Sequence, residues 1–246
     1  HAKKDVTIVM TGEGADEIFA GYFQYKVVNL LRSPIKRHAA SLVIIVPKSV
    51  LNRAFEYTSS LGDKGMERFQ NVLRSEDHRK RYLEIVSIFD DMEKKELMGP
   101  SNVSYIAKFP RQDSLNSMLI FDVRTELHGD LLMKVDKMTM AHSIEARAPF
   151  MDSEVVELAA AMPANLKLRG MKDKYLLRKM SAELLPKNIV KRKKHNFFLP
   201  LNEWNLKDIA DSIISKQNME KIGLNHLYID KIMNGMDKSK LYYSRQ

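Results

Sequence analysis

The chain has 246 residues with a net charge of +9, and its hydrophobic fraction of 44% and charged fraction of 29% are typical of one large globular domain or two small ones. Cysteine is absent, which excludes disulfides, thiolate metal sites and a cysteine nucleophile. No window approaches the ~18 uninterrupted apolar residues of a membrane span, so we expect a cytoplasmic protein with no membrane partner.

The first predicted element is a strand over residues 6–10, which is too apolar for an exposed edge and should be buried. A Gly-rich turn at 11–16 and a helix follow it, and this order is typical of a phosphate-handling site in an α/β protein. Glu13 and Asp16 lie within the turn, where carboxylates beside glycines suggest a metal between protein and phosphates. The alternative is an ordinary turn in which Asp16 caps the helix.

The helix after this turn should be continuous, with one apolar stripe formed by Phe19, Phe23, Val27 and Leu30. Residues 34–96 keep a helical pattern to which we assign no chemistry. Two more helices are expected on either side of an interruption at His128-Gly129. Strand patterns are scarce beyond residue 10, so we expect a mainly α-helical chain around a fragment of sheet.

Towards the end of the chain, Asp152 is predicted to cap a helix that Pro163 terminates. Residues 166–168 are a candidate short strand that turns at Gly170. Glu145 and Arg147 could pair with each other, and we interpret them as architectural. Trp204 should pack against the body of the protein.

The segment from Lys167 to Lys194 contains eleven Lys or Arg residues against two acids, so its local charge equals the whole net excess of +9. Such a band attracts nucleic acid, a membrane surface or polyphosphate, although a solvated basic face is the commoner case. A helix is predicted from about residue 173 to 185. Its apolar side would carry Leu176, Met180 and Leu184, and its other side Lys174 and Arg178.

Three segments together resemble the C-terminal synthetase domain of glutamine-hydrolysing asparagine synthetases. They are TGEGADEIFAGY at 11–22, LLMKVDKMTMAHSIEARAPFMD at 131–152, and LKLRGMKDKYLLRK at 166–179 continuing to KRKKHNFFLPLNEW at 191–204. They occur in the family's order and at family-like spacing. The whole chain, residues 1–246, would then be the C-terminal portion of that domain.

The resemblance implies a doubly wound α/β fold of the ATP pyrophosphatase type, with ATP and Mg²⁺ as cofactors. It implies that ATP activates aspartate as an adenylate, which ammonia then converts to asparagine. By the same resemblance, Thr11 and Gly12 contact ATP, Glu13 is needed to form the aspartyl-adenylate, Asp16 binds magnesium, and Lys174 reaches the phosphates or the intermediate. The resemblance also allows a homodimer.

Two parts of the family pattern are absent from these residues. One is the glutaminase domain with its terminal cysteine, so we expect that this chain does not hydrolyse glutamine and that a separate domain supplies the ammonia. The other is the phosphate loop of the SGGxDS type, since the chain has no Ser-Gly or Gly-Gly pair. We therefore expect the chain alone to be inactive. In relatives a glycine usually follows the paired lysines, whereas His195-Asn196 stands here, which leaves the role of Lys191–Lys194 open.

Two rival interpretations remain. A β-lactam synthetase or another amide-forming adenylating enzyme would resemble this chain closely, but such enzymes typically carry tyrosine where Glu13 stands. A non-catalytic basic helical module would bind nucleic acid through residues 167–194. That segment lacks the aromatic interleaving of base-stacking proteins and any recognised motif, so we expect no nucleic-acid partner.

Overall fold

The computed structural model describes residues 1–35, 38, 70–87, 89–99, 109, 114–192 and 216–235. The chain divides into two compact units, of which the first combines His1–Ser33 with Ile106–Lys193 and the second combines Pro34–Tyr105 with Lys194–Gln246. In the described part, no helix combines the length and apolar character that crossing a membrane requires. Trp204 and Lys193–Phe197 lie outside the described residues.

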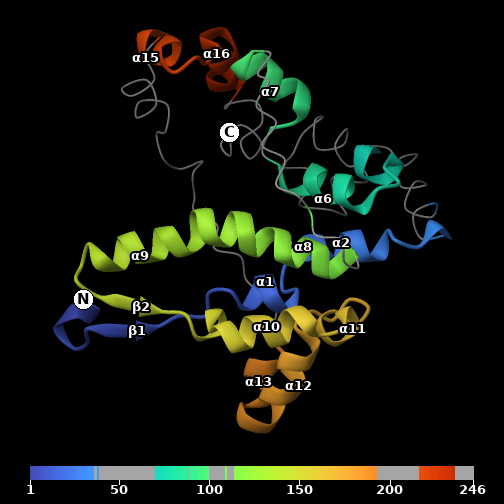
Figure 1. Ribbon diagram of the computed structural model, residues 1–246, viewed down its shortest axis with the longest axis vertical. Helices are drawn as coiled ribbons and strands as arrows, with labels where there is room; N and C mark the ends of the chain where they lie inside the picture. The colour runs from blue at the N-terminus through green and yellow to red at the C-terminus, as the bar shows by residue number, and fades with distance from the viewer. Residues whose placement is uncertain are drawn as a thin grey trace. The chain divides into compact units, whose positions relative to one another are not determined.

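The first unit contains a two-stranded parallel sheet, drawn side by side in Figure 1. A short 3-10 turn, η1 (Ala2–Lys4), precedes β1 (Ile8–Met10), which pairs with β2 (Glu145–Arg147) so that Val9 lies opposite Ala146. The strand predicted near the N-terminus is therefore present, and Glu145 and Arg147 belong to its partner strand. Their side chains do pair with each other, with 2.8 Å between Arg147 Nε and Glu145 Oε1.

The expected burial of the first strand is wrong for the described residues. Val6 and Ile8 are each more than 40% exposed, and Met10 is 69% exposed. Within the described part of the chain β1 has only one neighbouring strand, so its apolar side chains lack the cover that a wider sheet provides. A helix–strand pattern alone does not report how many neighbours a strand has.

The predicted continuous helix after the Gly-rich turn is also wrong. It is broken into α1 (Ala15–Phe19) and α2 (Phe23–Leu30), because Ala20 adopts a left-handed conformation with φ 57°. The break rotates the two pieces relative to each other, so Phe19 is buried while Phe23 is 65% exposed. The buried residues of α2 are Tyr25 and Val28.

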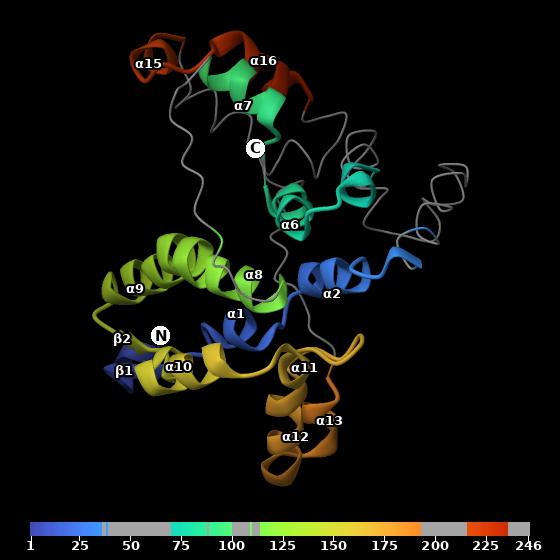
Figure 2. The ribbon, with the colours of Figure 1, turned by 45° about the vertical axis from the view of Figure 1, so that its right-hand side comes forward.

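Residues 114–140 form one unbroken helical run, visible as the long green ribbon in Figure 2. It consists of α8 (Ser114–Asp122), the π-helical segment η3 (Val123–Leu132) and α9 (Met133–Met140). The interruption predicted at His128-Gly129 does not occur, since the wider π-helical turns carry both residues without a break. Four buried apolar side chains anchor the run, namely Leu115, Met118, Leu119 and Leu127.

Asp152 caps α10 (Ser153–Ala161) as predicted, and its carboxylate accepts a hydrogen bond from Glu154 N at 3.0 Å. The short helix η4 (Pro149–Met151) precedes α10, and the helix ends before Pro163. Ile18, Phe19 and Ala159 form a buried cluster where α1 meets α10. The sequence therefore fixes the ends of α10 through a cap and a proline, and packing against α1 buries its apolar face.

The predicted strand at 166–168 is wrong, because α11 (Ala164–Lys167) is helical there. The turn at Gly170 is present, and a bridge between Arg169 and Lys172 closes it. α12 (Tyr175–Leu184) and α13 (Lys187–Val190) follow. The bounds of α12 are close to those of the helix predicted at residues 173–185.

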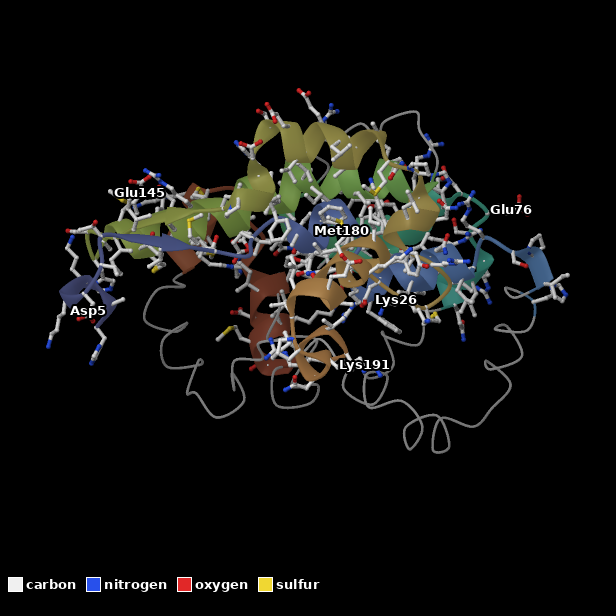
Figure 3. The ribbon with its side chains drawn as sticks, turned by 90° about the horizontal axis from the view of Figure 1, so that it is seen from below. Asp5, Lys26, Glu76, Glu145, Met180 and Lys191 are labelled. Atoms are coloured by element: carbon white, nitrogen blue, oxygen red, sulfur yellow. The ribbon has the colours of Figure 1, made fainter. Side chains whose placement is uncertain are left out.

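The apolar side predicted for α12 is not buried. Met180, labelled in Figure 3, is 60% exposed and Leu184 is 83% exposed. Leu177 instead packs against the buried cluster of α1 and α10. The helical period predicted an apolar stripe through Leu176, but the next residue, Leu177, makes the contact with the core.

The second unit is helical in its described part, as the sequence pattern predicts. It contains α6 (His78–Val86), α7 (Asp91–Met98), α15 (Lys216–Lys221) and α16 (His226–Gly235). A capping box starts α7, since the Asp90 carboxylate accepts from Glu93 N while the Glu93 carboxylate accepts from Asp90 N. Lys231 of α16 pairs with Glu96 of α7 at 3.1 Å. Taken together, the described residues confirm a mainly helical chain with little sheet.

Candidate active site

The Gly-rich turn lies between the end of β1 and the start of α1. Thr11 N donates to Arg147 O at 2.8 Å, which ends the ladder between the two strands. Gly14 is the N-cap of α1 with φ 88°, and a Cβ on it would lie 2.2 Å from Met151 Sδ. Glycine is required there on both counts. The N-cap position belongs to Gly14, so the alternative role of Asp16 as a helix cap is wrong.

The turn leaves open space at Gly12 and a buried polar group at Thr11. A Cβ at Gly12 would meet no atom within 4 Å. The hydroxyl of Thr11 is buried and has no hydrogen-bond partner among the described residues. A buried hydroxyl without a partner is costly unless a ligand or water satisfies it. This combination fits a polar ligand such as a phosphate at the turn.

Asp16 and Lys174 meet beside this turn although they are far apart in the sequence. Lys174 Nζ lies 3.1 Å from Asp16 Oδ1, and both side chains are 23% exposed. Lys174 is the N-cap of α12, and its amide donates to Phe19 O, at the end of α1, at 3.2 Å. The structure therefore brings the acidic turn and the basic helix together.

Gly21 makes this close approach possible, and the sequence pattern did not single it out. A Cβ at Gly21 would lie 1.8 Å from Asp16 Oδ1 and 2.5 Å from Lys174 Cε. Any larger residue would therefore occupy the space of the ion pair. The only signal in the sequence is a glycine five residues after Asp16, next to the unrecognised helix break.

Glu13 lies half-buried in the turn, and its carboxylate has no hydrogen bond or ion pair among the described residues. Glu17, which the sequence analysis did not select, is 2% exposed and accepts a hydrogen bond from the Tyr22 hydroxyl. Burial raises the pKa of Glu17, the Tyr22 bond opposes this, and the charges of Asp16 and Glu13 raise it further. The turn and the first residues of α1 therefore concentrate three carboxyl groups, and burial disfavours the charged form of one of them, Glu17.

Of these three carboxyl groups, that of Asp16 is the one the sequence analysis assigns to magnesium. No cluster of three or more metal-ligating side chains occurs among the described residues. Magnesium is often held by one or two carboxylates, with waters and substrate phosphates completing its shell. The site therefore fits a metal that arrives with a phosphate ligand rather than one held by protein side chains alone.

Comparison with known proteins places these features in a family. The family model for asparagine synthase matches residues 1–246. The chain belongs to the asparagine synthase family. It is 32% identical over 219 residues to asparagine synthetase [glutamine-hydrolyzing] 1 of Bacillus subtilis, which covers 83% of this chain and 32% of that protein. No solved structure matches it significantly.

Two further relatives match this chain over most of its length. A putative asparagine synthetase [glutamine-hydrolyzing] of Mycobacterium tuberculosis is 31% identical over 210 residues, covering 83% of this chain and 31% of the relative. A Penicillium rubens protein named amidase chyE is 22% identical over 91% of this chain and 37% of its own length. The chain thus spans about a third of the length of the curated relatives it matches.

Proposed function

We propose that this chain contributes the aspartate-activating site of an enzyme that makes asparagine through a β-aspartyl-AMP intermediate. The observation that carries the proposal is the Asp16–Lys174 pair beside an open Gly-rich turn, in a member of the asparagine synthase family. In the first step the β-carboxylate of aspartate attacks the α-phosphorus of ATP and pyrophosphate leaves. In the second step ammonia attacks the acyl carbon, and AMP leaves as asparagine forms.

Each site residue has a defined task in this scheme. The Gly12 amide and the buried Thr11 hydroxyl bind phosphate oxygens of ATP, while the Thr11 amide stays paired with Arg147 O. Lys174 stabilises the negative charge that develops on the departing pyrophosphate. Asp16 holds Mg²⁺, which when bound neutralises phosphate charge. Glu13, whose carboxylate is unpaired among the described residues, acts on the aspartate side of the reaction in this proposal.

The source of the ammonia concerns the other two thirds of these relatives, which the present chain does not match. The names of the Bacillus and Mycobacterium relatives describe hydrolysis of glutamine. We infer that ammonia reaches this site from glutamine hydrolysed in another domain. The enzyme would then take aspartate, ATP and ammonia as substrates at the site described here.

The test uses the full-length protein that carries these residues, supplied with aspartate labelled with ¹⁸O in its β-carboxylate. The aspartyl-adenylate route transfers one labelled oxygen to AMP, and aspartate must be required for pyrophosphate release. Glu13→Gln should abolish aspartate-dependent pyrophosphate release, and Asp16→Asn should raise the Mg²⁺ concentration needed for half-maximal rate. Unlabelled AMP, or wild-type pyrophosphate release from Glu13→Gln, would contradict the proposal.

A second candidate is another amide-forming adenylation, because the chain also matches, over 91% of its length, a Penicillium protein that is named an amidase and not an asparagine synthetase. Glu13 argues for aspartate, because the β-lactam-forming relatives typically carry tyrosine at its position. A screen of carboxylate substrates for pyrophosphate release decides between the two. Release with aspartate alone supports asparagine formation, whereas release with a different carboxylate supports the second candidate.

A further inference from the structure

The residue immediately before Lys174 is held by two cations from different helices. Asp173 is 9% exposed, and its Oδ2 lies 2.6 Å from Lys26 Nζ of α2. Its Oδ1 lies 3.0 Å from Arg178 Nη2 and 3.1 Å from Arg178 Nε, both from α12. Lys26 is labelled in Figure 3. Both carboxylate oxygens are thus engaged, and the carboxylate joins α2 to α12.

Arg178 extends this connection further along the chain. Its Nη1 donates to Val190 O at 2.7 Å, at the end of α13, and its Nε also reaches Asp173 O at 3.2 Å. A planar guanidinium that binds a carboxylate and backbone carbonyls at once has little freedom to rotate. The backbone of Asp173 is therefore fixed through both its side chain and its carbonyl group.

The conformation of Lys174 needs such support. Lys174 has φ 45° and ψ 39°, the left-handed region that residues other than glycine seldom adopt. Strained backbone of this kind persists only where the surrounding structure enforces it. One enforcing contact is the hydrogen bond from Lys174 N to Phe19 O, and the other is the clamp on the preceding residue.

We propose that Asp173 is a positioning residue for Lys174, and that Lys26 and Arg178 act with it as a clamp. The clamp keeps the left-handed turn at Lys174 and so directs its ammonium group at Asp16. The effect on catalysis rests on the proposed function, whereas the effect on the position of Lys174 does not. If Asp173 only held the two helices together, its loss would lower the stability of the fold. It would not selectively change the position of the Lys174 side chain.

The position of Lys174 can be tested without any substrate. Trace acetylation with acetic anhydride, followed by mass spectrometry, compares the amine of Lys174 with that of exposed Lys179 on the same helix. In the wild-type full-length protein, Lys174 should react more slowly because it is paired with Asp16. Asp173→Asn should raise the relative rate at Lys174 by about three- to tenfold, since the released side chain becomes as accessible as an ordinary lysine.

Three further variants make this result specific. Asp173→Glu keeps the charge and should restore part of the protection of Lys174. Lys26→Met removes one side of the clamp and should give a smaller increase, which also covers the case in which Asp173→Asn fails to fold. Asp130→Asn breaks an exposed ion pair with Lys134 and serves as the matched control, with no change at Lys174. Unchanged Lys174 acetylation in folded Asp173→Asn and Lys26→Met would overturn the proposal.

The catalytic consequence is tested by a double-mutant cycle on aspartate-dependent pyrophosphate release. Asp173→Asn should lower kcat by roughly a hundredfold with little change in the KM for aspartate, since small misplacements of a catalytic group have effects of this size. In a Lys174→Ala background the same substitution should have no further effect. Independent, multiplicative losses would overturn the positioning role. Changed acetylation with unaltered pyrophosphate release in every variant supports the clamp and refutes the catalytic role of Lys174.

Discussion

Replacing Gly21 with alanine tests whether the Asp16–Lys174 pair depends on a missing side chain. The added Cβ would lie 1.8 Å from Asp16 Oδ1, 2.7 Å from Asp16 Cγ and 2.5 Å from Lys174 Cε. The backbone of Gly21 does not have a positive φ, so alanine meets no conformational obstacle there. The perturbation is therefore a steric collision with the ion pair alone.

The size of the effect follows from these distances. To restore van der Waals separation, the carboxylate must retreat by roughly 1.5 Å, which breaks an ion pair whose atoms are now 3.1 Å apart. A half-buried ion pair contributes up to about 1 kcal/mol, and forcing a methyl group into a filled space costs about 1–3 kcal/mol. We therefore expect Gly21→Ala to lower the free energy of unfolding by about 2 kcal/mol.

Urea denaturation of the full-length protein measures this loss, and Gly12→Ala is the matched control. Gly12 lies in the same turn, also has no positive φ, and a Cβ there meets nothing within 4 Å. Its substitution should change the free energy of unfolding by less than about 0.5 kcal/mol. If Gly21→Ala is as stable as Gly12→Ala and keeps wild-type pyrophosphate release, the steric account of the ion pair is refuted.

Three other substitutions probe separate features, each by denaturant unfolding. Tyr22→Phe removes the donor to buried Glu17 and should cost about 1–3 kcal/mol. Because the pKa of Glu17 is raised by burial, its ionisation destabilises the fold as pH rises, so this loss should be smaller at acidic pH than at pH 7. Burial would raise the pKa of Asp173, but its cation partners lower it overall. The stability lost in Asp173→Asn should therefore be present at pH 7 and should vanish as pH falls below about 4; a pH-independent loss would contradict this. Gly129→Ala, at an exposed helical position with open space, should raise the free energy of unfolding by about 0.5–1 kcal/mol, seen as a higher denaturation midpoint at unchanged m value; a lower midpoint would contradict the unbroken helix.

Local signals in the sequence predicted those elements whose ends are set by nearby residues. Asp152 and Pro163 fix the two ends of α10, and both lie where side-chain capping and a missing N–H place them. The apolar run before the Gly-rich turn likewise predicted a strand. Its burial could not be predicted, because burial depends on which segments pair with β1 and on what covers them.

The candidate site was predictable in part for a similar reason. Two acids in a Gly-rich turn and a lysine in a basic helix have complementary charges, so their proximity could be inferred, and Lys174 does lie beside Asp16. Their catalytic roles remain predictions. Glu17 and Asp173 were not identified, because the residue type alone does not show whether a carboxylate is buried or exposed. What distinguishes them is the tertiary contact with Tyr22 or Lys26.

The helix break after Phe19 explains both what the sequence missed and how the site forms. In a continuous helix, Phe19 O would accept the amide of Phe23, four residues later. Because α1 ends at Phe19, that carbonyl accepts the amide of Lys174 instead. The break also lets the Tyr22 hydroxyl reach Glu17, although residues five apart point in different directions on an unbroken helix. A helical pattern that is violated at Ala20 therefore yields the contacts that position Lys174, as expected where local propensity conflicts with function.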